Sequence, residues 1–112
     1  MALPVSYRIK KKKDFDLVFK KGKTTSGYFL FIKTITTTRN HARFGFIVAA
    51  KFAPKAVTRN KIRRMFGDTV WPKLLPNIPA CDTVVVVTKK VSTDISDIKT
   101  DFLTTLRRAH SI

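Results

Sequence analysis

The sequence has few acidic residues, and this scarcity constrains its function more than any other feature of its composition. Its 112 residues contain no glutamate and only seven aspartates, against 23 lysines and arginines, for a formal net charge of +16. Residues 1–67 hold 17 of the cations and only Asp14 and Asp16, whereas residues 68–112 hold six cations and five aspartates. One part of the fold must therefore carry a strong positive potential, which attracts polyanions. Nucleic acid is the first expected partner, and an anionic membrane is the second.

Other scarce features exclude whole classes of site. The single cysteine, Cys81, leaves no intramolecular disulfide and no cysteine-based zinc site, and we expect it to be a small buried core residue. No apolar run approaches the length of a membrane span, and the first residues, MALPVSYRIKKKK, lack the apolar stretch of a signal peptide. The expected location is therefore the cytoplasm, with no membrane partner.

The length of the chain suits one domain with one core.

We find no catalytic site and no metal site among the protein's own side chains. Asp94, Asp97 and Asp101 share a helical spacing, but they are better explained as the solvated first half of an amphipathic helix than as a metal cluster. His41 lies in an expected turn and His110 near the C-terminus, and nothing places the two together for acid–base chemistry. If the protein serves catalysis, the catalytic groups are expected to belong to another molecule.

The hydrophobic pattern predicts one α+β domain over residues 1–112, with the element order α-β-β-α-β-α. Residues 1–13 are expected to form a basic, extended arm, and Asp14 is expected to cap a short helix over 15–21 that ends at Gly22. At about 100° per residue, Phe15, Val18 and Phe19 share one face of that helix, and Leu17 points the other way.

The remaining elements follow from strand and helix patterns. Residues 28–37 and 43–50 are expected to form two strands paired as a hairpin, and Gly45 between two phenylalanines suggests close approach of a neighbouring group. The later elements are a helix over 55–70, a proline-rich connection over 71–80, a strand over 83–88 that is buried on both faces, and an amphipathic helix after residues 92–93.

The segment AVTRNKIRRMF, residues 56–66, combines an apolar helix face with a dense cationic one. The apolar side chains fall on one side of the helix, and the other side carries Arg59, Asn60, Arg63 and Arg64. Neighbouring like charges on a helix repel by tenths of a kcal/mol per pair, and this segment has no acid to relieve them. Arginine forks bind phosphate, and an asparagine amide suits a phosphate, a ribose hydroxyl or a base edge.

Aromatic side chains provide a second feature expected of a nucleic-acid site. Phe15 and Phe19 are flanked by lysines on both sides in the sequence, and most of the other seven phenylalanines are expected in the core. Unpaired bases stack on exposed rings, so cations beside such rings suit a single-stranded nucleic acid better than a duplex.

Together these segments resemble the bacterial ribonuclease P protein subunit. AVTRNKIRRMF resembles the basic helix of that family, which begins Ala-Val-x-Arg-Asn-Arg-Ile-Lys-Arg. DFDLVFKKGK at 14–23, RFGFIVAAK at 43–51 and RIKKKKDF at 8–15 resemble three further family segments in the right order. The departures are Lys61 in place of arginine, Gly67 where a basic residue is common, and alanine at positions 49, 50 and 53.

The resemblance implies a two-layer α+β sandwich with a mixed sheet and a left-handed βαβ crossover between the second and third expected strands. It also implies that the RNA subunit of ribonuclease P, with Mg²⁺ held by that RNA and its substrate, removes the 5′ leader of precursor tRNA. The protein binds the RNA subunit and the single-stranded leader, and no further protein partner is required.

The resemblance also assigns residues to two binding surfaces. By matching position, the basic helix that docks on the RNA subunit carries Arg59, Asn60, Lys61, Arg63 and Arg64. The leader cleft, between the first helix and the sheet, carries Phe15, Phe19, Lys12 and Lys51.

Two other functions fit the charge. A structural RNA-binding protein, such as a small ribosomal protein, shares the size and the basic character but does not require two phenylalanines beside a basic helix. A cationic membrane-surface protein requires a broad apolar helix face opposite its cations, whereas the VVVV strand and the C-terminal helix favour a folded core.

Overall fold

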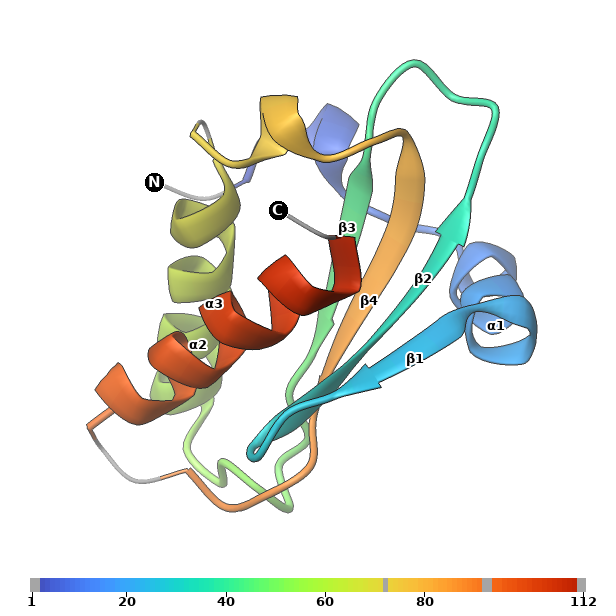
Figure 1. Ribbon diagram of the computed structural model, residues 1–112. Helices are drawn as coiled ribbons and strands as arrows, with labels where there is room; N and C mark the ends of the chain where they lie inside the picture. Colours follow the sequence, from blue (N-terminus) through green and yellow to red (C-terminus); the bar gives the residue numbers. More distant parts are fainter. Residues whose placement is uncertain (1–2, 72, 92–93, 111–112) are drawn as a thin grey trace.

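The computed structural model describes residues 3–71, 73–91 and 94–110, and it forms one α+β domain. Four strands make one mixed sheet with the spatial order β1-β2-β4-β3. The strands are β1 (Lys23–Ser26), β2 (Leu30–Thr36), β3 (Arg43–Ile47) and β4 (Cys81–Val87). Helix α1 (Lys12–Lys21) lies on one side of the sheet, and α2 (Ala56–Val70) and α3 (Ser96–His110) lie on the other (Figure 1).

The expected hairpin between residues 28–37 and 43–50 is wrong. Strand β2 pairs with β1 and β4, both antiparallel, and β3 pairs in parallel with β4. The valine-rich β4 is buried along almost its whole length and therefore occupies the interior of the sheet, between β2 and β3. The short, polar β1 was missed, because KTTS carries no apolar alternation.

Strands β3 and β4 are parallel neighbours joined through α2, as a parallel pair requires a crossover connection. This is the unit in which the resemblance places the left-handed crossover. A short 3₁₀-helix, η2 (Leu75–Asn77), lies in the expected proline-rich connection between α2 and β4. The crossover sets α2 against the β3 edge of the sheet.

The main core lies between the sheet and the pair α2 and α3. Its largest fully buried side chains include Phe44, Phe66 and Phe102, and the rings of Phe66 and Phe102 are 4.5 Å apart between centroids. Cys81 is buried, as expected. A second, small cluster of Ile9, Val18 and Val84 lies under α1. The core therefore fixes α2 firmly, while α1 rests on a much smaller apolar contact.

The N-terminal arm, expected to be basic and extended, packs closely against the rest of the domain and is only partly extended. Leu3 and Ile9 are buried, and residues 5–7 form a 3₁₀-helix, η1 (Val5–Tyr7). The backbone N–H of Ile9 donates to the carbonyl of Phe44, so the arm runs along β3. Two of its residues, Lys12 and Lys13, already belong to α1. The arm packs in this way because it contains apolar side chains, which are buried against the rest of the domain. Residues 1 and 2 lie outside the described residues.

Two further local expectations are settled by contacts. Asp14 does not cap α1, which begins two residues earlier; it lies in the first turn, where a carboxylate complements the helix dipole. Helix α1 ends before Gly22, as expected. In α2, a Cβ at position 67 would lie 3.0 Å from the backbone nitrogen of Leu3, so Gly67 lets the N-terminal segment pack against the helix.

Candidate nucleic-acid interface

One groove brings the basic helix and the first helix together. It has a volume of about 370 Å³ and runs around the β3 edge of the sheet. Asn60, Arg63 and Arg64 of α2, Phe15 of α1 and Arg8 of the arm line it. We call it the aromatic groove. Residues as distant in the sequence as Arg8 and Arg64 thus form one surface.

The ring of Phe15 is positioned by a glycine. Gly45 lies on β3 beneath the ring, and a Cβ at this position would lie 2.6 Å from Phe15 Cζ, well inside any normal contact. Phe15 itself is only half-buried, so part of the ring faces the groove. The expectation that a neighbouring group approaches Gly45 closely is therefore confirmed, and that group is the aromatic ring of the candidate site.

The amide of Asn60 organises the basic face. Arg63 donates from Nη2 to Asn60 Oδ1 at 2.6 Å, one turn along the helix. This bond leaves the amide NH₂ of Asn60 for a partner and holds the Arg63 guanidinium at the groove, beside the exposed Arg64. An asparagine among these cations thus accepts a hydrogen bond from Arg63 through its oxygen and keeps its NH₂ group available to donate to a ligand.

The other two cations predicted on this helix point elsewhere. Arg59 is half-buried, and its Nη1 donates to the carbonyls of Ala53 and Pro54, 2.9 Å away in each case, so it anchors the loop before α2. Lys61 is exposed on the side that faces Asp94, whose pKa is lowered mainly by hydrogen bonds from Ser96 and further by Lys61. Neither residue lines the aromatic groove.

The remaining predicted residues of the cleft do not line this groove either. Phe19 is half-buried against the small cluster under α1, and Lys33 of β2 donates from Nζ to its carbonyl at 3.1 Å. Lys12 is exposed in the first turn of α1. Lys51 is exposed in the loop after β3, with Nζ 5.6 Å from the centre of the Phe52 ring. The structure thus divides the predicted cleft into a groove at Phe15 and separate residues around it.

Arg8 was not predicted as a site residue, although it lines the aromatic groove. It is exposed, and its backbone forms an isolated parallel bridge to Phe44 on β3. This bridge places the Arg8 backbone beside β3, at the edge of the sheet. In the sequence, Arg8 is only one of several cations near the N-terminus. Such a run does not indicate which of its side chains is solvated and which lines a groove.

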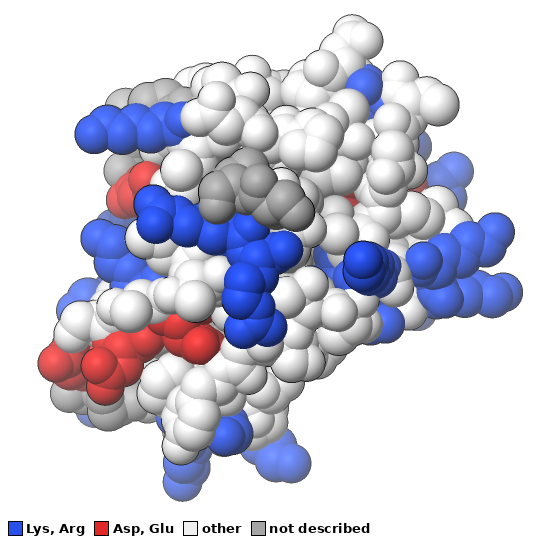
Figure 2. Space-filling model, viewed as in Figure 1, with Lys and Arg blue, Asp and Glu red and all other residues white. Residues whose placement is uncertain are grey.

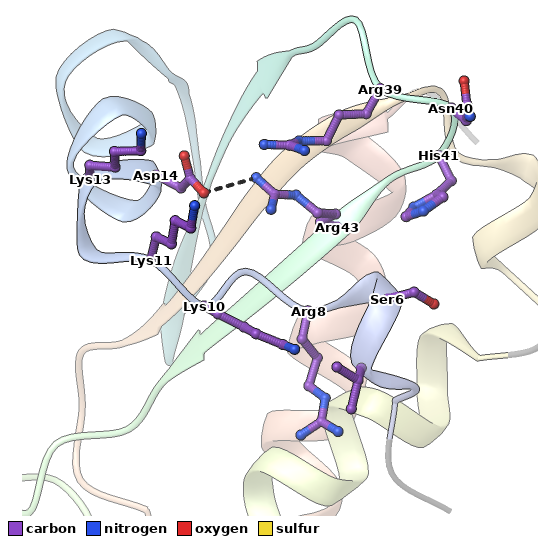
Figure 3. A pocket seen from close by; sticks show the side chains of 11 residues that line it. Ser6, Arg8, Lys10, Lys11, Lys13, Asp14, Arg39, Asn40, His41 and Arg43 are labelled. Carbon is purple, nitrogen blue, oxygen red and sulfur yellow. Dashed lines mark hydrogen bonds and ion pairs between the residues drawn. The ribbon is translucent and has the colours of Figure 1, made fainter.

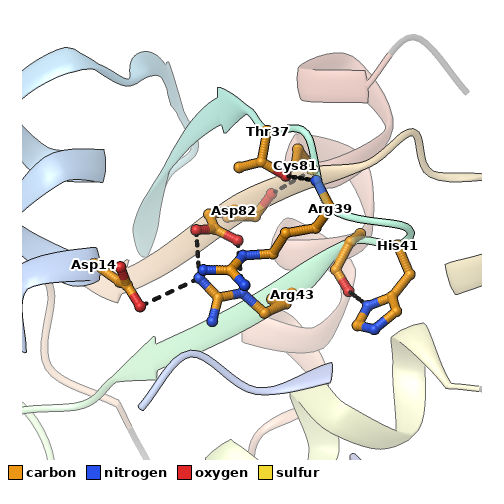
Figure 4. Close-up of polar contacts among 9 residues, drawn as sticks. Asp14, Thr37, Arg39, His41, Arg43, Cys81 and Asp82 are labelled. Atoms are coloured by element: carbon orange, nitrogen blue, oxygen red, sulfur yellow. Dashed lines mark hydrogen bonds and ion pairs between the residues drawn. The ribbon is translucent and has the colours of Figure 1, made fainter. Parts of the chain in front are cut away.

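Arg43 is the cation that the described carboxylates neutralise. It donates to both oxygens of Asp82, at 2.9 and 2.7 Å, and to Asp14 at 3.4 Å (Figure 4). The hydrogen bond to Asp82 is the main reason that the pKa of this guanidinium is raised. Among the described residues, no carboxylate forms such a pair with Arg63 or Arg64. The positive charge of the groove therefore remains available to a ligand.

Three of the five aspartates of the second half of the chain, Asp94, Asp97 and Asp101, lie just before or within the first turns of α3. Figure 2 shows an acidic patch over the start of α3, at the lower left, and lysine and arginine side chains around α1 at the right as well as elsewhere on this face. Asp101 of α3 is not merely solvated as expected, because its carboxylate accepts from the backbone N–H groups of Tyr28 and Phe29. It therefore fixes the β1–β2 turn.

The described residues contain no group of three His, Cys, Asp or Glu side chains that could hold a metal ion. The histidines lie on different elements: His41 packs against the Tyr7 ring, and His110 Nε2 lies 3.3 Å from Thr83 Oγ1 on β4. None of the described helices combines the length and the apolar character needed to cross a lipid bilayer.

Comparison with known proteins gives a consistent answer. The sequence model of the family described as Ribonuclease P matches residues 3–110. The chain is 34% identical over 86 residues to the ribonuclease P protein component of Streptococcus pyogenes serotype M5, covering 77% of this chain and 71% of that protein. It is 36% identical over 63 residues to the corresponding component of Staphylococcus haemolyticus; this match covers 56% of this chain and 54%, about half, of that protein.

Solved structures agree over more of the chain. The RNase P protein of Staphylococcus aureus superposes with a TM-score of 0.82 at 29% identity, covering 92% of this chain and 94% of that one. The RNase P protein of Thermotoga maritima superposes with a TM-score of 0.73 at 28% identity, covering 90% and 96% of the two chains.

Proposed function

Because the chain belongs to the ribonuclease P protein family, we propose that it is the protein subunit that binds the ribonuclease P RNA and the single-stranded 5′ leader of precursor tRNA. The observation that carries the proposal is the aromatic groove, in which Phe15 faces Asn60, Arg63 and Arg64. A ring opposite arginines that form no ion pair with a described carboxylate matches the two parts of a nucleotide, its base and its phosphate. The setting we propose is cytoplasmic.

In this proposal the leader binds at the α1 side of the groove. A base stacked on the half-buried ring of Phe15 gains about 1–3 kcal/mol, and Arg8 lies at the same groove for an adjoining phosphate. Lys12, Lys51 and Phe19 are then not direct neighbours of that base. We assign Phe19 to supporting α1 through its packing, and the two exposed lysines to the outer path of the leader.

The RNA subunit binds along α2 in this proposal. Arg64 and Lys61 are exposed, and Arg63 is held at the surface by Asn60, so three cations on one helix can neutralise phosphates. Arg59 contributes by anchoring the loop before α2, which fixes where the helix begins. The two RNA molecules would thus meet along one groove of the protein, and its cations reduce the repulsion between them.

The chemistry is assigned to RNA. We propose that Mg²⁺ is held by the RNA subunit and the substrate, where it would supply activation of the attacking water and stabilisation of the leaving oxygen. The described carboxylates suit this division, because Asp14, Asp82 and Asp101 are engaged in contacts within the fold. The protein's own residues bind and orient the leader, and no side chain is assigned a catalytic role.

Reconstitution tests the proposal. The protein is added to its cognate RNA subunit at low Mg²⁺, and release of the 5′ leader from precursor tRNA is measured. We expect cleavage to be restored at the mature 5′ end. A protein that bound RNA only as a structural component would leave the rate at that of the RNA alone, and this result would overturn the proposal.

A further inference from the structure

A second groove, larger than the first, lies where three segments meet. It has a volume of about 650 Å³ and is enclosed by the N-terminal arm, the first turn of α1 and the β2–β3 loop, residues 37–42 (Figure 3). Its cationic lining residues are Arg8, Lys10, Lys11, Lys13, Arg39 and Arg43. We call it the basic groove. No predicted site residue lines it, because the segments that form it are distant in the sequence.

The charge of this groove is almost entirely uncompensated. Arg43 is used within the fold, because Asp82 and Asp14 accept its hydrogen bonds. Asp14 is the only carboxylate in the lining, and its side chain is 15% exposed. The other five cations are exposed, and none of them forms an ion pair with a described carboxylate. Five like charges gathered around one hollow repel each other and favour a bound polyanion.

The lining distinguishes the kind of anion. The basic groove contains no phenylalanine, tyrosine or tryptophan, whereas the aromatic groove contains three phenylalanines. The one ring in its lining, His41, is half-buried with its centre 4.6 Å from that of Tyr7. Binding of unpaired bases depends on stacking platforms. A base-paired RNA instead presents phosphates outward and keeps its bases stacked inside, so it needs cations and few rings.

We propose that the basic groove binds the backbone phosphates of a base-paired segment of the RNA subunit. The inference rests on the proposed function, because it takes the RNA subunit as the partner. Arg8 lines both grooves, so the cationic surface continues from the basic face of α2, across the arm, to Lys11 and Arg39. One large RNA that docks on α2 can therefore follow this surface without a break.

The test removes two charges from the groove and keeps the fold. Lys13→Gln and Arg39→Gln are combined, since both side chains are exposed and neither anchors another element. Lys73→Gln with Lys99→Gln is the matched control, because it removes the same charge from exposed positions between α2 and α3. Affinity for the RNA subunit alone is measured over a range of salt concentrations.

For the groove variant we expect the slope of log affinity against log salt to become shallower by about two, and the affinity at low salt to fall about 10- to 100-fold. The control should lose less than about threefold, because its charges act only through the general field. Equal losses in the two variants would overturn the inference. Failure of the unaltered protein to bind the RNA subunit would instead overturn the proposed function.

A pair of short probes checks the type of RNA. A base-paired RNA hairpin should bind the groove variant more weakly than the control variant, while a single-stranded oligonucleotide should bind both equally. The opposite pattern, with the loss on the single strand, would assign the basic groove to the leader and would contradict the inference.

Discussion

At the scale of single residues, the contact between Phe15 and Gly45 defines the candidate leader site. The absence of a side chain on β3 lets the ring lie directly on the sheet, at the same groove as Asn60. A half-buried ring held in this way loses little conformational freedom when a base stacks on it. The exposed part of Phe15, and not the full set of phenylalanines, is therefore expected to determine leader affinity.

Replacing Phe15 by leucine should separate stacking from packing. Leucine keeps an apolar side chain over Gly45 but offers no ring, so affinity for precursor tRNA should fall about 5- to 100-fold. Affinity for mature tRNA should stay nearly unchanged, since it has no leader. Equilibrium binding of both RNAs to the reconstituted complex measures the difference.

Phe29→Leu is the control for that variant, because Phe29 lies at the β1–β2 turn and packs against the main core. This variant should not reduce the affinity for precursor tRNA more than the affinity for mature tRNA. Should Phe15→Leu weaken precursor and mature tRNA to the same extent, Phe15 would have no place in the leader site.

His110 should make the stability of the domain depend on pH. Burial lowers the pKa of its imidazole below the ordinary value of 6.5, so the folded state favours the neutral ring. The unfolded state then binds more protons as the pH falls below about 6.5, and the free energy of unfolding should decrease there. Urea unfolding between about pH 7.5 and 5.5 measures this, and His110→Gln should flatten the dependence. An equally steep dependence in that variant would assign the effect to other groups.

The sequence predicted which side chains share a face of α1 better than it predicted the contacts of the cations on α2. Helical spacing alone placed Phe15, Val18 and Phe19 on one face of α1, and Leu17 is indeed exposed to 43%. It could not show that Arg59 would turn back to the carbonyls of its own loop. That contact depends on how residues 49–54 fold, which local periodicity does not determine.

At the scale of elements, α1 is held on the sheet by few contacts. The apolar cluster beneath it is small, and two polar contacts supplement it: Asp14 with Arg43 near its first turn, and Lys33 with the carbonyl of Phe19 in its second half. Since α1 carries one wall of each groove, these contacts determine the width of both. Its position is thus the part of the fold to which binding should respond most.

Replacing Arg43 by methionine should destabilise the fold strongly. The change leaves Asp82, which is almost completely buried, without its bidentate partner, and it releases Asp14 on α1. Removing one member of a buried ion pair costs about 3 kcal/mol, and urea unfolding measures the change. Arg39→Met is the control, because Arg39 is exposed and its change should stay within about 0.5 kcal/mol. Similar losses in both variants would contradict a structural role for the Arg43 pair.

Elements with a strong pattern were predicted, and pairings between them were not. The apolar stripe of α3 and the unbroken valines of β4 identified both elements, because each buries a continuous face. The insertion of β4 between β2 and β3 could not be read from either strand, since the choice of neighbour depends on the whole sheet. For the same reason the basic groove could not be predicted from the sequence, since it is formed by the arm, α1 and the β2–β3 loop together.

At the scale of the whole molecule, the charge is divided unevenly along the chain. The first 67 residues build both grooves and carry most of the cations, while five of the seven aspartates lie in the second part of the chain. The central claim is that this positive surface is stable because RNA phosphates neutralise it. The charge that RNA neutralises is that of the other groove cations, since Arg43 is already neutralised within the protein.

The salt dependence of binding to the RNA subunit tests this claim most directly. The affinity of the unaltered protein is measured between about 50 and 200 mM salt, and its logarithm should fall linearly with the logarithm of the salt concentration. The slope should be about −0.7 to −0.9 for each phosphate neutralised, and several phosphates should contribute. An affinity that stayed constant over this range would contradict the account, because the cations of the two grooves would then make no contact with the RNA backbone.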